Sequence, residues 1–176
     1  MNDFSARIFI ETPRLYVRTW SHNDIEDLYE VMSNPATHYH SNENPWNIER
    51  CKGLVDYCKK NDFGKKPGTF NCPLICRKNG HLIGLVALNR YLKDKNIPEI
   101  EFTINQNFWS KGYATEIGKA VLEYGFKKCD FPAIIGFTSP DNLASRKVMH
   151  KIGMKYQGQK RLNSQLYSFY QAEKAV

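Results

Sequence analysis

Alternating apolar and polar positions recur along the chain, and each such stretch predicts a strand with one buried face. The clearest covers residues 99–104, where three apolar side chains share one face and Glu99, Glu101 and Thr103 share the other. Further strands are predicted at 14–20, 69–77, 82–88, 133–138, 154–156 and 166–172.

Apolar residues at helical spacing predict four helices, at 21–34, 47–61, 112–128 and 141–152. Ser21 and Asn47 are typical N-cap residues, and Gly153 is typical of the left-handed position that ends a helix. Segment 35–46 is expected to be a loop. The order of these elements predicts one mixed α/β domain over residues 1–176, with about seven strands and about four helices.

Composition excludes several classes of protein. The 176 residues are 41% hydrophobic and 24% charged, unlike disordered or collagen-like chains. The longest apolar run, around residues 82–88, is much shorter than the roughly 18 residues that a membrane-spanning helix needs. Five cysteines cannot all pair and none has the spacing of a metal or redox motif, so no metal site is expected. We therefore expect a soluble, cytoplasmic protein without a membrane partner.

The charge is distributed unevenly between the two parts of the chain. Residues 1–64 carry seven lysines and arginines against ten acidic residues, whereas residues 65–176 carry eighteen against eight. A basic region attracts anionic partners. Nucleic acid and a phosphorylated cofactor both satisfy this charge, and composition does not separate them.

Residues 105–116, N-Q-N-F-W-S-K-G-Y-A-T-E, join a predicted strand to a predicted helix and carry the features of an anion site. Gly112 has no Cβ, so backbone amides around it can approach a ligand closely. The helix that begins there presents unpaired N–H groups and the positive end of its dipole. Together these features favour a phosphate or pyrophosphate.

The same segment resembles the acyl-CoA-binding motif of the GNAT acetyltransferases, R/Q-x-x-G-x-G/A, which falls here on Trp109, Gly112 and Ala114. Its longer form W-x-K-G-Y-A-T-E is similar to the branch containing the bacterial ribosomal-protein N-terminal (RimJ/RimL-like) acetyltransferases. Residues 142–154 resemble the pattern N-x-x-S-x-x-V-x-x-K-x-G-F of that branch, and E-T-P-R-L at 11–15 resembles its opening. The three matches follow the family's order and span nearly the whole chain.

This resemblance implies a GNAT-like fold with a largely antiparallel sheet, and acetyl-CoA as co-substrate for acetylation of a primary amine. It implies that the CoA pyrophosphate is held by backbone amides of Ser110, Lys111, Gly112, Tyr113, Ala114 and Thr115. The strand at Phe102, Thr103 and Ile104 would pair with the pantetheine arm, which Asn142 and Ser145 would face. Lys151 or Lys147 would neutralise the ribose phosphate, although both are equally well explained as solvated helix charges.

Attack of an amine on a thioester needs a free amine, a stabilised oxyanion and a proton for the leaving thiolate. Glu99 stands where many family members carry a strand carboxylate, so Glu99, with Glu101 beside it, is our first candidate for a base acting through a water. The two glutamates can equally be interpreted as charges that attract a cationic substrate. Met149 stands where many members carry a tyrosine acid, which leaves Ser145 to hydrogen-bond the departing sulfur.

The acceptor is left open by the sequence. An α-amino group has a pKa near 7.7–8.0 against about 10.4 for lysine, so a weak base favours a protein or peptide N-terminus. A small-molecule amine, such as an aminoglycoside or a polyamine, is the alternative. Tyr39 and Trp46, in segment 35–46, are expected to contact the acceptor.

Two functions other than catalysis also remain open. One is CoA binding without transfer, which the departures Met149 and Gln157 motivate. The other is an RNA- or ribosome-binding module that uses aromatic and basic side chains of the C-terminal half. Ribosome contact could also accompany the enzyme, no DNA partner is expected, and either a monomer or a homodimer fits the sequence.

Overall fold

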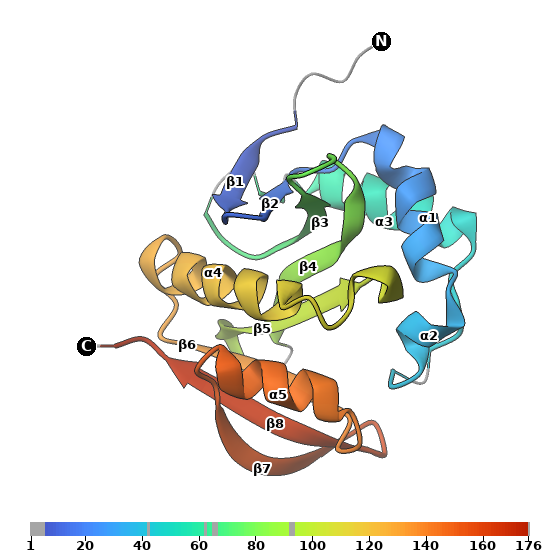
Figure 1. Cartoon of the computed structure of the whole chain (residues 1–176). Helices are drawn as coiled ribbons and strands as arrows, with labels where there is room; N and C mark the ends of the chain where they lie inside the picture. Colours follow the sequence, from blue (N-terminus) through green and yellow to red (C-terminus); the bar gives the residue numbers. More distant parts are fainter. Residues whose placement is uncertain (1–5, 42, 62, 65–66, 92–93, 176) are drawn as a thin grey trace.

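One eight-stranded sheet runs through the described part of the computed structural model, which covers residues 6–41, 43–61, 63–64, 67–91 and 94–175 (Figure 1). The strand order is β1-β2-β3-β4-β5-β6-β8-β7, and every neighbouring pair is antiparallel except β5 with β6. The strands are β1 Ile8–Glu11, β2 Leu15–Arg18, β3 Phe70–Cys76, β4 Leu82–Tyr91, β5 Asp94–Ile104, β6 Ala133–Thr138, β7 Lys155–Leu162 and β8 Gln165–Glu173.

The predicted capping residues occupy helix ends, with one correction: Ser21 caps the 3-10 turn His22–Asp24, and the α-helix that follows begins only at Ile25. The Ser21 side chain accepts from the Asn23 N–H, the Asn47 side chain accepts from the Arg50 N–H, and Gly153 has φ +94°. The α-helices are α1 Ile25–Met32, α2 Pro35–His38, α3 Ile48–Lys60, α4 Tyr113–Lys127 and α5 Leu143–Lys151, with 3-10 turns at His22–Asp24 and Gln106–Phe108.

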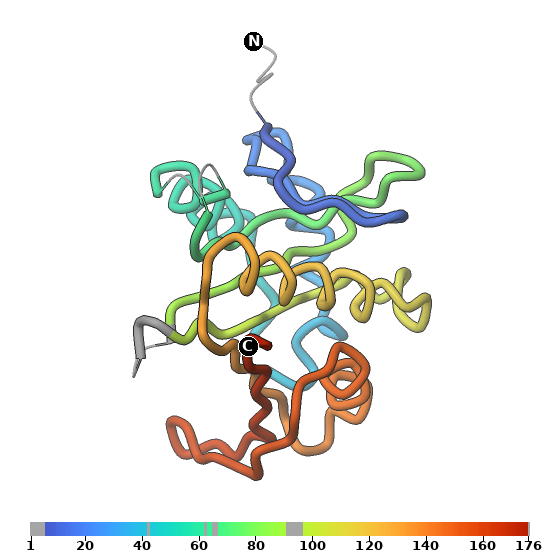
Figure 2. Tube along the Cα trace, turned by 90° about the vertical axis from the view of Figure 1, so that its left-hand side faces the viewer, coloured from blue at the N-terminus to red at the C-terminus, as the bar shows by residue number. Residues whose placement is uncertain are grey.

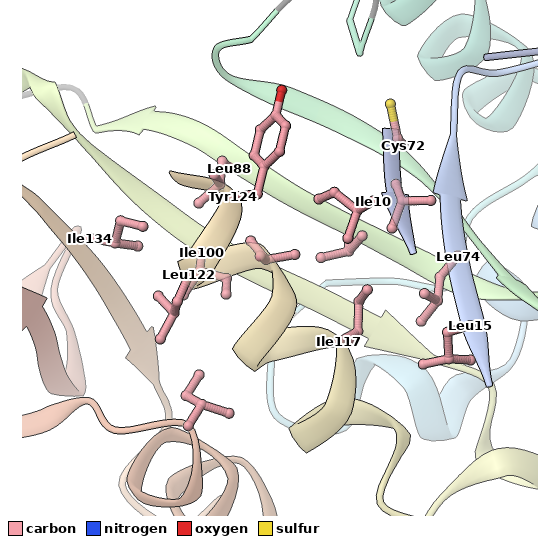
Figure 3. Close-up of a cluster of buried hydrophobic side chains, with 14 of the residues drawn as sticks. Ile10, Leu15, Cys72, Leu74, Leu88, Ile100, Ile117, Leu122, Tyr124 and Ile134 are labelled. Carbon is pink, nitrogen blue, oxygen red and sulfur yellow. The ribbon is translucent and has the colours of Figure 1, made fainter. Parts of the chain in front are cut away.

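Alternation along the central strands divides the buried apolar side chains between two cores, one on each face of the sheet. On one face, Leu74 and Val86 pack with Ile117 and Val121 of α4. Figure 3 shows α4 lying along this face, with labelled side chains of strands and helix pointing toward one another. On the other face, Leu85 packs with residues of α1 and α3. The sheet therefore lies between two helical layers.

Strands β5 and β6 part from one another in the middle of the sheet. Among the described residues, their register consists of the single pair Glu99 with Ile135, whereas β4 pairs with β5 along most of its length. Beyond Glu99, the edge of β5 that faces β6 has no ladder partners among the described residues. Figure 2 shows the N-terminal elements on one side of this region and the β7–β8 hairpin on the other.

The predicted fold class is confirmed, with corrections in detail. The sheet has eight strands because Ile8–Glu11 adds an edge strand beside β2, which a four-residue segment did not reveal. There is a fifth helix because residues 35–38, expected to be loop, form one turn that starts at the Asn34 cap with Pro35 at its first position. β5 also begins at Asp94 rather than at Glu99.

Among the described residues, no helix is long and apolar enough to cross a membrane. Within the same part of the chain, no group of three or more histidine, cysteine or acidic side chains is arranged to hold a metal ion. All five cysteines are unpaired thiols, and four are buried. Cys72, Leu74 and Cys76, at alternate positions of β3, belong to one core.

Candidate functional site

The loop between β5 and α4 is built by local hydrogen bonds from its own side chains. The Asn105 side chain accepts from the Asn107 N–H at 3.0 Å, and the Trp109 Nε1–H donates to the Ile104 carbonyl at 2.6 Å. The Lys111 Nζ donates to the Asn107 carbonyl at 2.8 Å. These bonds bring the chain to the first turn of α4 in a fixed conformation.

Ser110 and Gly112 both have left-handed backbone conformations, with φ of +59° and +79°. A left-handed residue directly before a helix turns successive N–H groups toward one side, which produces a concave anion site. The left-handed conformation costs a serine more than a glycine, because Cβ crowds the carbonyl oxygen. Ser110 therefore holds a conformation for which glycine is better suited, and the surrounding bonds enforce it.

The start of α4 is tied to the N-terminal segment through Glu116. Its Oε1 accepts from the Thr12 Oγ1 at 2.6 Å and from the Arg14 N–H at 2.9 Å, and its Oε2 accepts from the Arg14 Nε at 2.6 Å. Arg14 also donates to the Lys111 carbonyl at 2.9 Å and lies over the Tyr113 ring. Partial burial alone would raise the pKa of Glu116, but the bonds from Thr12 and Arg14 outweigh it and lower that pKa.

A pocket of about 610 Å³ lies between this loop, α5, α2 and the free edge of β5, within the range of small-molecule sites. It contains most of the residues that the sequence assigned to the cofactor. Those lining it are Phe102, Thr103, Ile104, Ser110, Gly112, Tyr113, Ala114, Thr115, Asn142, Ser145 and Lys151. The Lys111 side chain does not line the pocket, because it bonds back to the loop.

The N-cap residue of α5, Asn142, positions the residues that face the pocket from the start of this helix. The Asn142 Oδ1 accepts from the Ser145 N–H at 3.0 Å, which fixes both side chains at the start of the helix. Lys147 and Lys151 line the pocket further along the helix. Met149 faces the opposite way, into the core, where its Cε would lie 2.9 Å from a Cβ placed on Gly136.

Glu99 and Glu101 lie next to this pocket on β5, on the sheet face away from α4. Glu99 is partly buried, and burial, with the charge of Glu101 second, raises its pKa to about 8. Glu101 is more exposed as a residue, yet desolvation of its carboxylate raises its pKa, an effect that the Asn89 Nδ2 opposes by donating to Oε1 at 2.7 Å. The two carboxylates thus differ, because Glu101 has a fixed donor and Glu99 is the more strongly perturbed.

Tyr167 of β8 contributes to the same face from the other side of the gap between β5 and β6. Its pKa is raised by burial first and then by the charges of Glu99 and Glu43, so it lies within electrostatic reach of both. Its Oη donates to the Gln165 Oε1 at 2.8 Å, and its ring packs against Phe137. We call this surface, formed by Glu99, Glu101 and Tyr167, the acceptor face.

Segment 35–46 places its aromatic residues in two different environments. Tyr39 lines the pocket and is 79% exposed. Trp46 lies outside the pocket, where it packs against the core under α1 and α3, and its Nε1 donates to Glu43. The ring of His40 pairs with Asp141 across 3.6 Å, whereas His38 is buried against the Met32 carbonyl.

Several lining residues could not be identified from their own sequence context. Ala36, Thr37, Phe108, Ala144 and Val148 line the pocket only because α2, the loop and α5 converge on it. Asn89 and Tyr167 are brought to the carboxylates by strand pairing across the sheet. Phe108, Ala144 and Val148 lie inside the two quoted motifs, which gave them no role of their own, and the other residues belong to no short motif.

Comparisons with known proteins agree with this geometry. A model described as an acetyltransferase (GNAT) domain matches residues 14–155. The uncharacterized N-acetyltransferase YnaD of Bacillus subtilis is 34% identical over 149 residues, which are 85% of this chain and 84% of YnaD.

Solved structures share the fold along almost the whole length of the chain. A GNAT-family acetyltransferase from Bacillus anthracis superposes with a TM-score of 0.81 at 27% identity, over 94% of this chain and 98% of that one. RimL, a ribosomal L7/L12 alpha-N-protein acetyltransferase in complex with coenzyme A, superposes with a TM-score of 0.78 at 16% identity. That match covers 95% of this chain and 98% of the RimL chain.

Proposed function

This chain belongs to the GNAT family of acetyl-CoA-dependent N-acetyltransferases, and we propose that its acceptor is the α-amino group of a protein or peptide. The observation that carries the proposal is Glu99, a carboxylate with a pKa near 8 beside the pocket. An α-amino group has nearly the same pKa, so transfer of its proton to Glu99 costs little. A lysine side chain, with a pKa near 10.4, would lose its proton to Glu99 less readily by about 3 kcal/mol.

The pocket fits acetyl-CoA in both shape and donor chemistry. Backbone N–H groups around Ser110 and Gly112 provide the anion site, and Lys147 and Lys151 supply positive charge nearby. The free edge of β5 at residues 102–104 offers backbone groups to an extended amide-containing arm. We assign the pyrophosphate to the first site and the pantetheine to the second.

In the proposed reaction, Glu99 accepts one proton from the ammonium, directly or through a water. The amine nitrogen then bonds to the thioester carbonyl carbon, the bond from that carbon to sulfur breaks, and the second amine proton passes to the thiolate. Ser145, at the start of α5, assists by hydrogen bonding to the departing sulfur. The products are the N-acetyl amine and free CoA, with no covalent enzyme intermediate.

A polycationic small molecule is the second candidate, because Glu101 lies beside Glu99 and Glu43 is within electrostatic reach. The test is release of free thiol from acetyl-CoA with four acceptors. They are a peptide with a free N-terminus, the same peptide blocked at its N-terminus but carrying a lysine, spermidine, and an aminoglycoside.

We expect the free N-terminus to be acetylated with the highest kcat/KM. Preference for spermidine or the aminoglycoside would overturn the peptide assignment. Tight acetyl-CoA binding without thiol release for any amine would instead indicate a CoA-binding protein that does not catalyse transfer.

A further inference from the structure

A second cavity, of about 650 Å³, opens beside the acceptor face and contains none of the residues assigned to acetyl-CoA. Its lining includes Tyr57 and Asn61 near the end of α3, Asn71 of β3, and Asn89 and Arg90 of β4. We propose that this cavity is a subsite for the second and third residues of a peptide acceptor whose N-terminal amine lies at Glu99. The inference rests on the proposed function and extends it.

Strand register places the cavity on the same sheet face as the two carboxylates. Asn71 is paired with Ala87, and Ala87 is paired with Glu101, so the three side chains form one row across β3, β4 and β5. Asn89 is paired with Glu99 in the next row. Directly paired residues point to the same face, so cavity and carboxylates share one continuous surface.

Asn89 is the physical link between the two sites. It lines the cavity and also donates to the Glu101 Oε1 at 2.7 Å. Neighbouring strands are about 4.8 Å apart, and an extended peptide advances about 3.3 Å per residue. A chain that starts at Glu99 and crosses β4 toward Asn71 would therefore bring its second and third residues into the cavity.

The lining residues suit the backbone groups of a peptide better than the further ammonium group of a polyamine. Among the described lining residues there is no carboxylate, whereas Arg90 adds a positive charge at the exposed rim. The buried Asn71 Oδ1 has no hydrogen-bond donor within the described structure. A peptide backbone supplies N–H groups for the amide side chains of the lining, and its carbonyls are acceptors for Arg90 and Asn61. A polyamine has no carbonyl groups and would be repelled by Arg90.

The test measures kcat/KM for peptide amides of one, two, three and four residues with the same N-terminal residue. We expect kcat/KM to rise about tenfold or more between one and three residues, mainly through KM. Asn71→Leu and Arg90→Ala should bring the ratio of the three-residue to the one-residue value close to one. Arg161→Ala, an exposed arginine on β7, is the matched control and should preserve the ratio.

A second measurement, hydrogen–deuterium exchange, does not depend on turnover. The four-residue amide, without acetyl-CoA, should slow exchange at residues 69–71 and 89–90, and Asn71→Leu should abolish that protection. Protection without acetyl transfer would support the subsite while overturning the proposed function. Transfer without length dependence, or with spermidine preferred over every peptide, would overturn the subsite.

Discussion

The loop that begins α4 and the acceptor face lie close together but are held in very different ways. The loop is fixed by side-chain bonds from Thr12, Arg14, Asn105 and Trp109, and its conformation includes a left-handed serine. On the acceptor face, desolvation raises the pKa of the carboxylates. The hydrogen bond from Asn89 goes to Glu101 rather than to Glu99. The loop therefore holds a fixed conformation that suits an anionic ligand, whereas the acceptor face holds a carboxylate, Glu99, whose raised pKa lets it gain or lose a proton near neutral pH.

Loss of the left-handed geometry at Gly112 should have the largest effect. Gly112→Val should weaken acetyl-CoA binding by about 100-fold or more, because a β-branched residue is strongly disfavoured at φ +79°. Calorimetry on the folded variant measures this loss. Ser110→Gly is the matched control and should bind at least as well as the wild type, since glycine relieves strain at φ +59°. Unchanged affinity in Gly112→Val would remove the pyrophosphate assignment.

Cutting the Glu116 connection should have an intermediate effect on the same region. Glu116→Ala removes three hydrogen bonds to Thr12 and Arg14 and should lower the free energy of unfolding by about 1–3 kcal/mol. Thermal melts without acetyl-CoA would measure this loss of stability. Melts with saturating acetyl-CoA should also show a several-fold weaker affinity for acetyl-CoA. Glu123→Ala, on the exposed side of α4, serves as control because its pair with Lys127 is solvated. Equal effects of the two variants would argue against a special role for the connection.

Removing the charge at Glu99 should have the smallest effect on stability. Unlike the other substitutions, it should stabilise the protein at high pH. The folded state raises the pKa of Glu99 from 4.5 to about 8, so it retains this proton more tightly than the unfolded state does. Stability is therefore lost as pH rises through that window. If one pKa unit survives solvent screening, Glu99→Gln should melt about 3–6 °C above the wild type at pH 8.5 and level with it near pH 4.5. A difference that does not change with pH would contradict the raised pKa.

Sequence patterns predicted the parts of the molecule that depend on local physics. The caps at Ser21 and Asn47, the end of α5 at Gly153 and the shared face of Glu99 and Glu101 all follow from neighbouring residues. The connection from Arg14 to Glu116 joins residues about a hundred positions apart, and no local pattern encodes it. The motif around Arg14 was visible in the sequence, but its role in holding the loop was not.

The environment of the carboxylates also depended on tertiary structure. Alternation placed Glu99 and Glu101 on one face, but Asn89 and Tyr167 reach them only through pairing of β4 with β5 and of β6 with β8. Burial in the folded sheet raises the pKa of Glu99, and the degree of that burial cannot be inferred from the spacing of two glutamates. The roles of Tyr39 and Trp46 stay predictions, although Tyr39 alone of the two lines the pocket.

The most direct test of Glu99 as the base is a pair of pH–rate profiles for two peptide acceptors that differ in amine pKa. In the wild type, kcat/KM should fall on the acid side through two ionisations, one that moves with the acceptor and one that stays near pH 8. Glu99→Gln should retain only the ionisation that moves, with a deficit of about 10²-fold or more above pH 8 that narrows as pH falls, because only the wild type loses its base by protonation. Ser145→Ala should keep both ionisations and lose kcat uniformly. Wild-type and Glu99→Gln profiles of identical shape would show that Glu99 only attracts the substrate.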